Sequence, residues 1–449
     1  MAITNFYIGS SGSNVNAGST TGASAAYTST NGNWNGSTVF TPTDGSTPAS
    51  SISVGDYVSI YLDAATITTF VAQVTNVAAG VNGAITVSGS IVYGTAPSSG
   101  ASGRSIKAGG QWSSISPLTT SGMGTFTVPQ STKVNVKQSS YVILSSFTIA
   151  IAGSGTNLFW MSGYNTTPGD LDNDTTNSLS KPVLALSSGN SLTVSGADVL
   201  WTSISGTANV NSYGFLFLGN SIQVWRSRFE NTNSGGSSCA ALFNGAWESG
   251  FYCWFKAPTT SAIPVCYAVG GVGAFVGCVA EGGGLCGFSV AGATNLVNCI
   301  ALNNTGIGIS CGSAYLWISY CTVYNSSGDG IKWTGASGGL SSVIGCLLSN
   351  CGGYGINNSS GNLVSRACND FYSCTSGNEH SFGDYPAFFG QTDSSAVVTS
   401  STNMTPVSSS NAINNGFPGI FENETFSGFT AIGAVQPKGG GGFVPQIIE

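Results

Sequence analysis

A cysteine returns through the second half of the chain at nearly constant intervals, and this repeat constrains the fold more than any other feature. Successive copies are separated by 21, 22, 25 and 22 residues. The repeated residues are Cys278, Cys299, Cys321, Cys346 and Cys368. A glycine followed by an apolar residue keeps nearly the same register, at Gly287-Phe288, Gly308-Ile309, Gly330-Ile331 and Gly355-Ile356. An internal repeat of about 20 to 25 residues with strand-like content predicts a solenoid.

The residues around the cysteine indicate strands. Apolar or small side chains alternate with others at Val276, Cys278 and Ala280, and later copies follow the same pattern. A period of two is typical of β-strands. A leucine-rich repeat of similar length needs a Leu/Asn consensus and a helical segment, and the sequence has neither. We therefore expect the first four cysteines to form one vertical stack inside the solenoid.

An asparagine accompanies the cysteine at a fixed distance. In three copies it follows the cysteine by four residues, at Asn303, Asn325 and Asn350. A buried amide at a turn can satisfy backbone groups and stack on its copies in neighbouring coils. Projected backwards in steps of 25 and 26 residues, the register reaches Cys253 and Ser227, and Asn231 stands four residues after Ser227. The repeat therefore begins before the regular cysteines do.

These features resemble one known group, the right-handed parallel β-helix proteins, which include pectate-lyase-like enzymes and phage tailspikes. The segment FYIGSSGSNVNAG at 6–18, the later Gly55-Asp56-Tyr57-Val58 and the closing Ile432-Gly433-Ala434 are similar to the opening, the "GD-x-V" strand and the "DIGA" ending of such chains. Ala431 stands where the group usually has Asp. The resemblance implies an all-β, right-handed parallel β-helix solenoid with an N-terminal β cap or small β domain. Its motifs are structural and bring no catalytic residue with them.

Composition and register divide the chain into four parts. We expect an N-terminal β-rich cap or assembly domain over 1–110, the parallel β-helix over 111–382 and a looser closing section over 383–436. A four-glycine hinge and an apolar tail complete the chain over 437–449. A short apolar peptide after four glycines has little reason to be ordered alone. We expect the tail to dock on its own β-helix or, as extended peptides do by strand addition, on a neighbouring subunit, and we predict the second.

The charge content limits the partners. Charged residues make up 6% of the chain, against roughly 25% in ordinary domains, and the net charge is −7. The 11 Lys and Arg residues form no basic cluster, so nucleic acid is not expected as a partner. No stretch approaches the roughly 18 apolar residues of a membrane span, so no membrane insertion is expected.

The cysteines and the N-terminus suggest where the protein folds. The start MAITNFYIGSSG does not have the basic and apolar regions of a secretory signal. Spacing by one coil stacks most of the 12 cysteines instead of pairing them, so we expect free thiols and folding in a reducing cytoplasm. A polar, weakly charged surface made without an export signal suggests a virion component produced in the host cytoplasm. The alternative location is extracellular or on a cell surface.

One short segment combines residues suited to acid and base catalysis. Glu379, His380 and Asp384 lie together in GNEHSFGDY. Two neighbouring carboxyl groups can act as acid and base in glycoside hydrolysis. A polar surface loop is the structural alternative. If these residues are not catalytic, the acids on the coils at Glu230 and Glu281, and Glu248 between them, are the next candidates.

The densest run of oxygen ligands is Asp170-Leu171-Asp172-Asn173-Asp174. Three alternating aspartates can share one hard cation, so Asp170, Asp172 and Asp174 are a candidate Ca²⁺ site. The run lacks the central glycine and distal glutamate of an EF-hand loop, and a solvated turn is the structural alternative.

Two functions from different classes remain, together with a third alternative. The main prediction is a structural or receptor-facing virion protein, a decoration, spike or fibre component, that assembles with other virion subunits as a homo-oligomer. The first alternative is a polysaccharide-cleaving enzyme, a lyase or glycoside hydrolase that acts on a host-surface polysaccharide. The second is a cell-surface adhesin.

Overall fold

The computed structural model describes residues 4–12, 19–22, 24–61, 69–93, 100–113, 118, 131–150, 157–171, 180–271, 273–312, 315–335, 340–382, 387, 390–395, 398–400, 403–406 and 409–410. These residues form strands and turns, with one short 3-10 helix at Pro48–Ser50. No helix of the described part is long and apolar enough to cross a membrane. The chain forms two compact units, one of residues 1–185 and 192–205, the other of residues 186–191 and 206–449.

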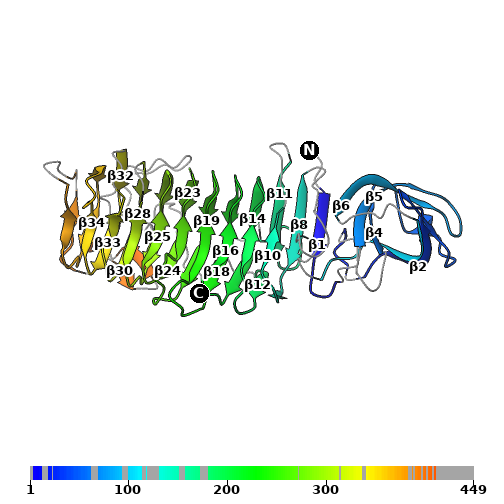
Figure 1. Cartoon of the computed structure of the whole chain (residues 1–449). Helices are drawn as coiled ribbons and strands as arrows, with labels where there is room; N and C mark the ends of the chain where they lie inside the picture. The colour runs from blue at the N-terminus through cyan, green and yellow to red at the C-terminus, as the bar shows by residue number, and fades with distance from the viewer. Residues whose placement is uncertain are drawn as a thin grey trace. The chain divides into compact units, whose positions relative to one another are not determined.

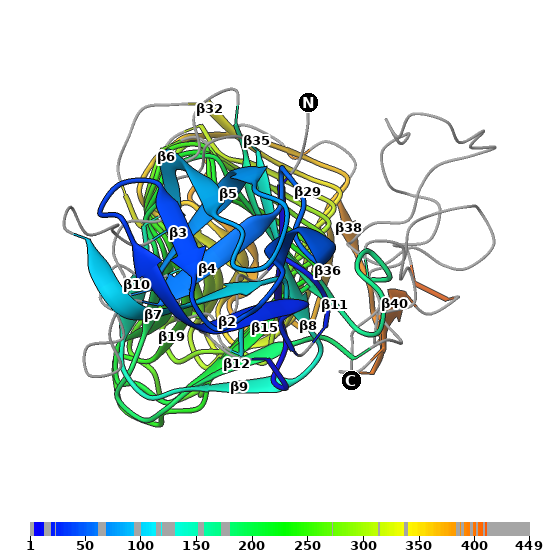
Figure 2. The same ribbon diagram turned by 90° about the vertical axis from the view of Figure 1, so that its right-hand side faces the viewer.

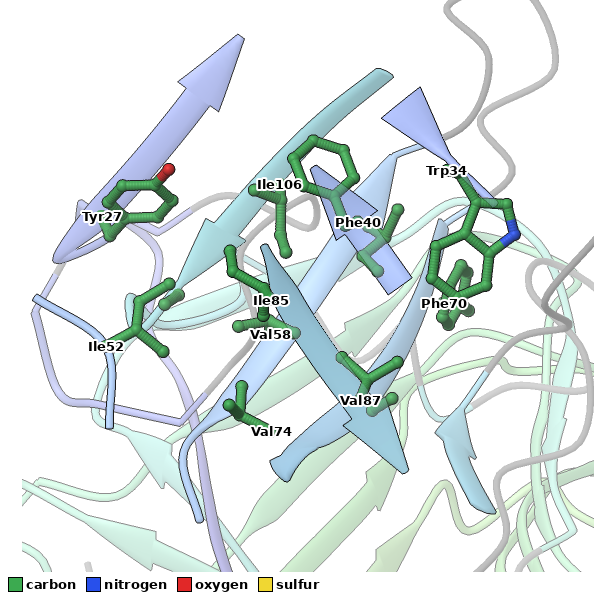
Figure 3. Packing of buried hydrophobic residues seen from close by; sticks show 13 residues of the cluster. Tyr27, Trp34, Phe40, Ile52, Val58, Phe70, Val74, Ile85, Val87 and Ile106 are labelled. Atoms are coloured by element: carbon green, nitrogen blue, oxygen red, sulfur yellow. The ribbon is translucent and has the colours of Figure 1, made fainter. Parts of the chain in front are cut away.

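The first unit contains a closed antiparallel barrel, drawn in blue in Figure 1. Around the barrel the strands are β2 (Tyr27–Trp34), β3 (Val39–Pro42), β6 (Ile85–Tyr93), β5 (Thr69–Val77), β4 (Tyr57–Tyr61) and β7 (Ala101–Ala108). Aromatic and branched side chains fill it, among them Trp34, Phe40, Val58 and Phe70 (Figure 3). Closing the sheet removes its free edges, which would otherwise pair with other chains. The prediction of a small N-terminal β domain is confirmed.

The first unit also contains parallel strands of the solenoid. β1 (Thr4–Ile8), β8 (Thr132–Lys137), β11 (Phe159–Tyr164) and β14 (Val199–Thr202) pair in this order. β9 (Ser140–Ile143) pairs with β12 (Val183–Leu186), and β10 (Phe147–Ile149) pairs with β13 (Leu192–Val194). Thr4 is in register with Thr132, so the chain begins in the solenoid, leaves it to form the barrel and returns. The range predicted as a cap therefore includes one solenoid strand.

The second unit is a parallel β-helix with three sheets, which we name A, B and C in chain order. Sheet A contains β16 (Tyr213–Phe217), β19 (Cys239–Phe243), β22 (Cys266–Ala268), β25 (Cys286–Val290), β28 (Ile307–Cys311), β31 (Ile331–Trp333), β34 (Tyr354–Asn357) and β37 (Gly377–His380). Sheet B contains β17 (Gln223–Trp225), β20 (Ser249–Phe251), β23 (Gly273–Val276), β26 (Thr294–Val297), β29 (Trp317–Ser319), β32 (Leu340–Ile344) and β35 (Leu363–Ala367). Sheet C contains β15 (Ser205–Ala208), β18 (Arg228–Asn231), β21 (Trp254–Ala257), β24 (Val279–Gly282), β27 (Ile300–Leu302), β30 (Thr322–Ser326), β33 (Leu347–Cys351), β36 (Asp370–Tyr372) and β38 (Gln391–Thr392).

Each sheet grows by one strand per coil, and Figure 2 shows the strands of the second unit one behind another. Crossovers between parallel strands are right-handed, so the predicted all-β, right-handed parallel β-helix is confirmed. After β38 the chain forms an antiparallel pair, β39 (Val398–Ser400) with β40 (Asn403–Pro406). The apolar tail predicted to dock on a neighbouring subunit lies outside the described residues.

The cysteine stack is present inside the β-helix. Each of the four residues is 0% exposed and stands directly before a strand of sheet C. The residue after each cysteine pairs in register with its counterpart on the next strand. Cys278, Cys299, Cys321 and Cys346 therefore form the predicted interior stack. The fifth copy differs, because Asp370 pairs with Leu347 and places Asn369, instead of Cys368, level with Cys346.

Left-handed turns make the corners before and after sheet C. Before the sheet, the corner residues with positive φ are Arg226, Tyr252, Gly277, Asn298, Tyr320, Gly345 and Cys368. After it, Asn303, Asn325 and Asn350 have φ of 54°, 57° and 54°, values that asparagine tolerates better than most residues. Asn325 Nδ2 donates to Asn303 Oδ1 at 2.8 Å, as the stacking predicted, although these amides are not buried. Their main contribution is the left-handed backbone.

The repeated glycines mark the corner between sheets C and A. A Cβ atom on Gly308 would lie 2.4 Å from Val323 Cγ1, and one on Gly330 would lie 2.7 Å from Leu348 Cδ2. Both neighbours are core side chains of sheet C. The repeat therefore keeps glycine because the backbone packs directly against the core at this corner.

Candidate functional site

Glu379, predicted to be catalytic, lies in the row of side chains that fills the β-helix. It pairs with Ile356, which pairs with Ile331 one coil earlier. Arg366 takes the equivalent position in sheet B, in register with Val343. In the last coils of these sheets, a glutamate and an arginine therefore stand where earlier coils have apolar residues.

Arg366 and Glu379 form a buried ion pair. Arg366 Nη1 donates to Glu379 Oε2, and the guanidinium lies over the Phe382 ring at 3.7 Å. Burial raises the pKa of Glu379, and the charge of Arg366 partly opposes this rise. Glu379 Oε1 has no hydrogen-bond partner among the described residues. The pair closes the apolar core with charged groups.

His380 faces the opposite way from Glu379. Neighbouring residues on a strand point to opposite faces, and the exposed His380 ring stacks on Tyr354, with centroids 4.4 Å apart. Glu379 and His380 therefore do not converge on one outer surface. Asp384 lies outside the described residues. The catalytic role of Glu379, His380 and Asp384 stays a prediction, and the geometry separates its first two members.

Asp170, the first residue of the predicted Ca²⁺ site, accepts hydrogen bonds from its own turn. The amide groups of Asn165, Thr166 and Thr167 donate to its carboxylate at 2.9, 2.8 and 3.0 Å. Burial acts to raise the pKa of Asp170, but these bonds outweigh it and lower the pKa. Asp172 and Asp174 lie outside the described residues. Within the described part no group of three or more His, Cys, Asp and Glu residues could hold a metal, and the Ca²⁺ site stays a prediction.

A cluster that the sequence analysis did not assemble lies on the outer face of sheet C. Glu230 pairs in register with Lys256, and Lys256 pairs with Glu281. The cluster, which we name the sheet C site, consists of Arg228, Glu230, Trp254, Lys256 and Glu281. Its members come from β18, β21 and β24. The alternate residues on these strands, Phe229, Phe255 and Ala280, are 0% exposed and face the core.

Ion pairs and a cation–π contact organise the sheet C site. Arg228 Nη2 lies 3.2 Å from Glu230 Oε2, and Lys256 Nζ lies 3.2 Å from Glu281 Oε1. The Arg228 guanidinium lies 4.2 Å from the Trp254 ring centroid. The four charged side chains are between 20% and 37% exposed, so a ligand can reach them.

Trp254 adds an unused hydrogen-bond donor to the site. Its side chain is largely covered, and its Nε1 has no acceptor among the described residues. A buried polar group without a partner costs free energy, and a ligand that supplies the acceptor recovers it. An acceptor-bearing ligand on this face would therefore be favoured.

The spacing of the two glutamates suits chemistry on a glycosidic bond. Glu230 and Glu281 are two strands apart, and strands are spaced by roughly 4.8 Å, so their backbones are roughly 10 Å apart. The two catalytic carboxyl groups of inverting glycosidases are roughly 6.5 to 9.5 Å apart, which leaves room for a water molecule. Side-chain rotation can bring Glu230 and Glu281 into this range.

The sequence did contain a signal for this cluster. Glu230, Lys256 and Glu281 are separated by 26 and 25 residues, the same steps that connect Ser227, Cys253 and Cys278. The search for carboxyl pairs one coil apart missed them because the lysine lies between them.

Glu248, the remaining coil acid, does not join the sheet C site. It lies in the turn before β20 and is buried. Burial raises its pKa to about 8, although the Gly245 amide donates to Oε2 at 2.7 Å and opposes this rise. Its Oε1 has no partner among the described residues. Glu248 is therefore a neutral buried acid at neutral pH, away from the other two glutamates.

Comparisons with known proteins give distant structural neighbours. No protein-family model and no curated protein matches the chain. Pectate lyase Pel9A has 12% identity and a TM-score of 0.45 over 68% of this chain and 88% of its own. A mannuronic acid specific family 6 lyase from human gut microbiota has 12% identity and a TM-score of 0.38 over 59% and 74%. The catalytic domain of a GH87 alpha-1,3-glucanase has 10% identity and a TM-score of 0.32 over 83% and 89%. With likenesses this weak, the fold assignment rests on the strand pairing itself.

Proposed function

We propose that this protein is a polysaccharide-cleaving enzyme that hydrolyses glycosidic bonds at the sheet C site. The observation that carries the proposal is the in-register row of Glu230, Lys256 and Glu281 on one partly exposed face. In a chain with only 6% charged residues, such a concentration of charge on three neighbouring strands is unusual.

The proposed reaction needs both glutamates. One carboxyl group donates a proton to the glycosidic oxygen as the bond from that oxygen to the anomeric carbon breaks. The other carboxylate takes a proton from a water molecule whose oxygen bonds to the same carbon. One water molecule is consumed for each bond cleaved. Because the water attacks from the face opposite the leaving group, this geometry predicts inversion at the anomeric carbon.

The remaining members of the site position the reacting groups. Lys256 lies between the two glutamates and orients Glu281 through their ion pair. Arg228 orients Glu230 and packs on Trp254, which limits the freedom of both side chains. The free Trp254 Nε1–H and the unused Lys256 donors can bind sugar hydroxyl groups.

The test is release of reducing ends from a panel of polysaccharides that includes α-1,3-glucan, pectate and alginate. Glu230→Gln and Glu281→Gln should each lower kcat by about 100-fold or more, because each removes one of the two proton-transfer groups. Asp198→Asn is the control, since it removes a charge from a left-handed turn outside the site and asparagine tolerates the same φ of 55°.

Three outcomes would contradict the proposal. Activity that both glutamine variants retain in full would exclude the sheet C site. Unsaturated products would show elimination instead of hydrolysis. An absence of cleavage across the whole panel would leave the enzyme proposal unsupported.

The structural virion role stays a prediction. The described residues and the comparisons do not bear on other virion subunits, on a homo-oligomer or on the virion surface as a location. The adhesin alternative has the same standing. A host-surface polysaccharide, the partner predicted for the enzyme alternative, is the substrate class of the proposal above.

A further inference from the structure

A second polar cavity lies in the first unit, beside the segment that resembles the "GD-x-V" motif. Its volume is about 340 Å³. Its wall includes Asn5 from β1, Gly55, Asp56 and Tyr57 at the start of β4, and Gln73 from β5. Ser19, Thr20, Ser51 and three small residues complete it. The cavity belongs to a different unit from the sheet C site.

The turn before β4 holds the cavity wall in place. Gly55 has a φ of 99°, a value that L side chains rarely adopt. Asp56 Oδ2 accepts a hydrogen bond from the Ser53 amide at 2.8 Å, and Gln73 Nε2 donates to the Gly55 carbonyl at 3.1 Å. These bonds tie the turn to the neighbouring strand β5, so the polar groups of the wall have fixed positions.

Each of these side chains keeps hydrogen-bonding capacity for a ligand. Asp56 Oδ1 and Gln73 Oε1 accept no hydrogen bond from any described residue. Asn5 Oδ1 accepts from Asn135 Nδ2 at 3.2 Å, while Asn5 Nδ2 donates to no described residue. The wall therefore offers two acceptors and one amide donor. The Tyr57 ring, packed edge-on against Phe6 at 5.3 Å, adds an apolar surface.

The lining excludes most ligand classes. No Lys, Arg or His residue lines the cavity, so it does not suit an anion. The single carboxylate provides too few charged oxygens for a tightly bound cation. The amide and hydroxyl groups do not suit an apolar ligand. A ligand whose hydroxyl groups both donate and accept hydrogen bonds, and which has one apolar face, fits all of these groups.

We infer that this cavity is a non-catalytic binding site for a neutral sugar residue. Asp56 and Gln73 accept hydrogen bonds from sugar hydroxyl groups, Asn5 Nδ2 donates to one, and the Tyr57 ring contacts the apolar face of the sugar. The volume of the cavity, about 340 Å³, lies at the lower end of the range for small-molecule sites, as expected for one or two sugar rings.

The test is saturation-transfer NMR and titration calorimetry of the full chain with D-glucose, D-galactose and D-mannose. At least one of these sugars should bind to the full chain. Asp56→Ala and Gln73→Ala should each weaken its binding about tenfold, because each removes one hydrogen bond to the ligand. Asn76→Ala on the same strand β5 is the matched control, since Asn76 does not line the cavity. Equal melting temperatures of the variants would show that the fold is intact.

A further variant separates this inference from the proposed function. Glu281→Gln should keep the sugar affinity of the unmodified chain, since the sheet C site and the cavity have no residue in common. The inference is overturned if none of the three sugars binds, or if Asp56→Ala and Gln73→Ala bind as tightly as Asn76→Ala. Calcium ions that bind more tightly than the sugars, in a manner that depends on Asp56, would also overturn it. None of these results changes the expected behaviour of Glu230 and Glu281.

Discussion

The carboxyl groups of Asp370 and Asp393 meet at the hydroxyl group of Ser410. Ser410 Oγ lies 2.5 Å from Asp393 Oδ2 and 3.4 Å from Asp370 Oδ2, and all three residues are buried. Burial, followed by the negative charge of Asp393, raises the pKa of Asp370 to about 7. Leu347 and Gln391, which pair with Asp370 on its two sides, carry no charge to oppose this effect. The two acids therefore fasten the segment around Asp393 and Ser410 to sheet C most strongly when they hold a proton.

This pair makes stability depend on pH in a defined direction. The folded chain holds the Asp370 proton up to about pH 7, whereas the unfolded chain releases it near pH 4. The free energy of unfolding should therefore fall as pH rises between these values, by at most about 1.4 kcal/mol per pH unit. Urea unfolding across this range should show the slope in the unmodified chain and a smaller slope in Asp370→Asn. Identical slopes in the two proteins would contradict the shared proton.

The Arg366–Glu379 pair should act as one unit in stability. Arg366→Met leaves Glu379 buried without its partner and should cost about 3 kcal/mol of unfolding free energy. The double variant Arg366→Met, Glu379→Met should recover most of this loss, because apolar side chains then continue the rows of Val343 and Ile356. Denaturant unfolding of the single and double variants measures both effects. A double variant as unstable as the single one would show that the charges are not coupled. Replacing Glu379 by Ala is likewise expected to weaken the fold, which complicates its use as a test of catalysis.

The corner glycines should tolerate no side chain. Gly330→Ala would place a methyl group 2.6 Å from the Gly355 carbonyl oxygen and 2.7 Å from Leu348 Cδ2. Overpacking of this kind typically costs about 1 to 3 kcal/mol, and thermal unfolding should show a lower Tm. Gly236→Ala is the control, because a Cβ atom there meets nothing within 4 Å and no left-handed φ is required. Equal effects of the two substitutions would exclude the packing explanation.

The cysteines should differ sharply in reactivity. All twelve are free, and Cys374 alone is not fully buried. Burial raises the pKa of Cys299 and of Cys321 well above the usual range, whereas a hydrogen bond with Cys351 lowers the pKa of Cys374. A thiol reagent should therefore label Cys374 first in the folded chain, and Cys374→Ser should remove this fast phase. Titration after unfolding without reductant should find twelve thiols, and a count near zero would show that they pair in solution.

The sequence by itself determined the repeat, because each coil presents similar side chains at similar positions and the period appears in the order of residues. The cysteine register gave the interior stack of Cys278, Cys299, Cys321 and Cys346, and the glycine register marked a corner. It also determined the strand content and the small N-terminal β domain. What it missed were the reasons for the landmarks, since the left-handed turn before each cysteine and the core contact at each glycine are properties of the folded backbone.

Only the tertiary structure decided which distant residues meet. Glu230, Lys256 and Glu281 share a row because their coils contain 26 and 25 residues, whereas the coil from Cys278 to Cys299 contains 21. Strand pairing absorbs these differences in the turns, so the register across coils cannot be obtained from a constant step. The same pairing turned Glu379 toward Arg366 and its neighbour His380 toward solvent. The direction of a side chain on a strand alternates with every residue, and a displacement of one residue moves it from the core to the surface.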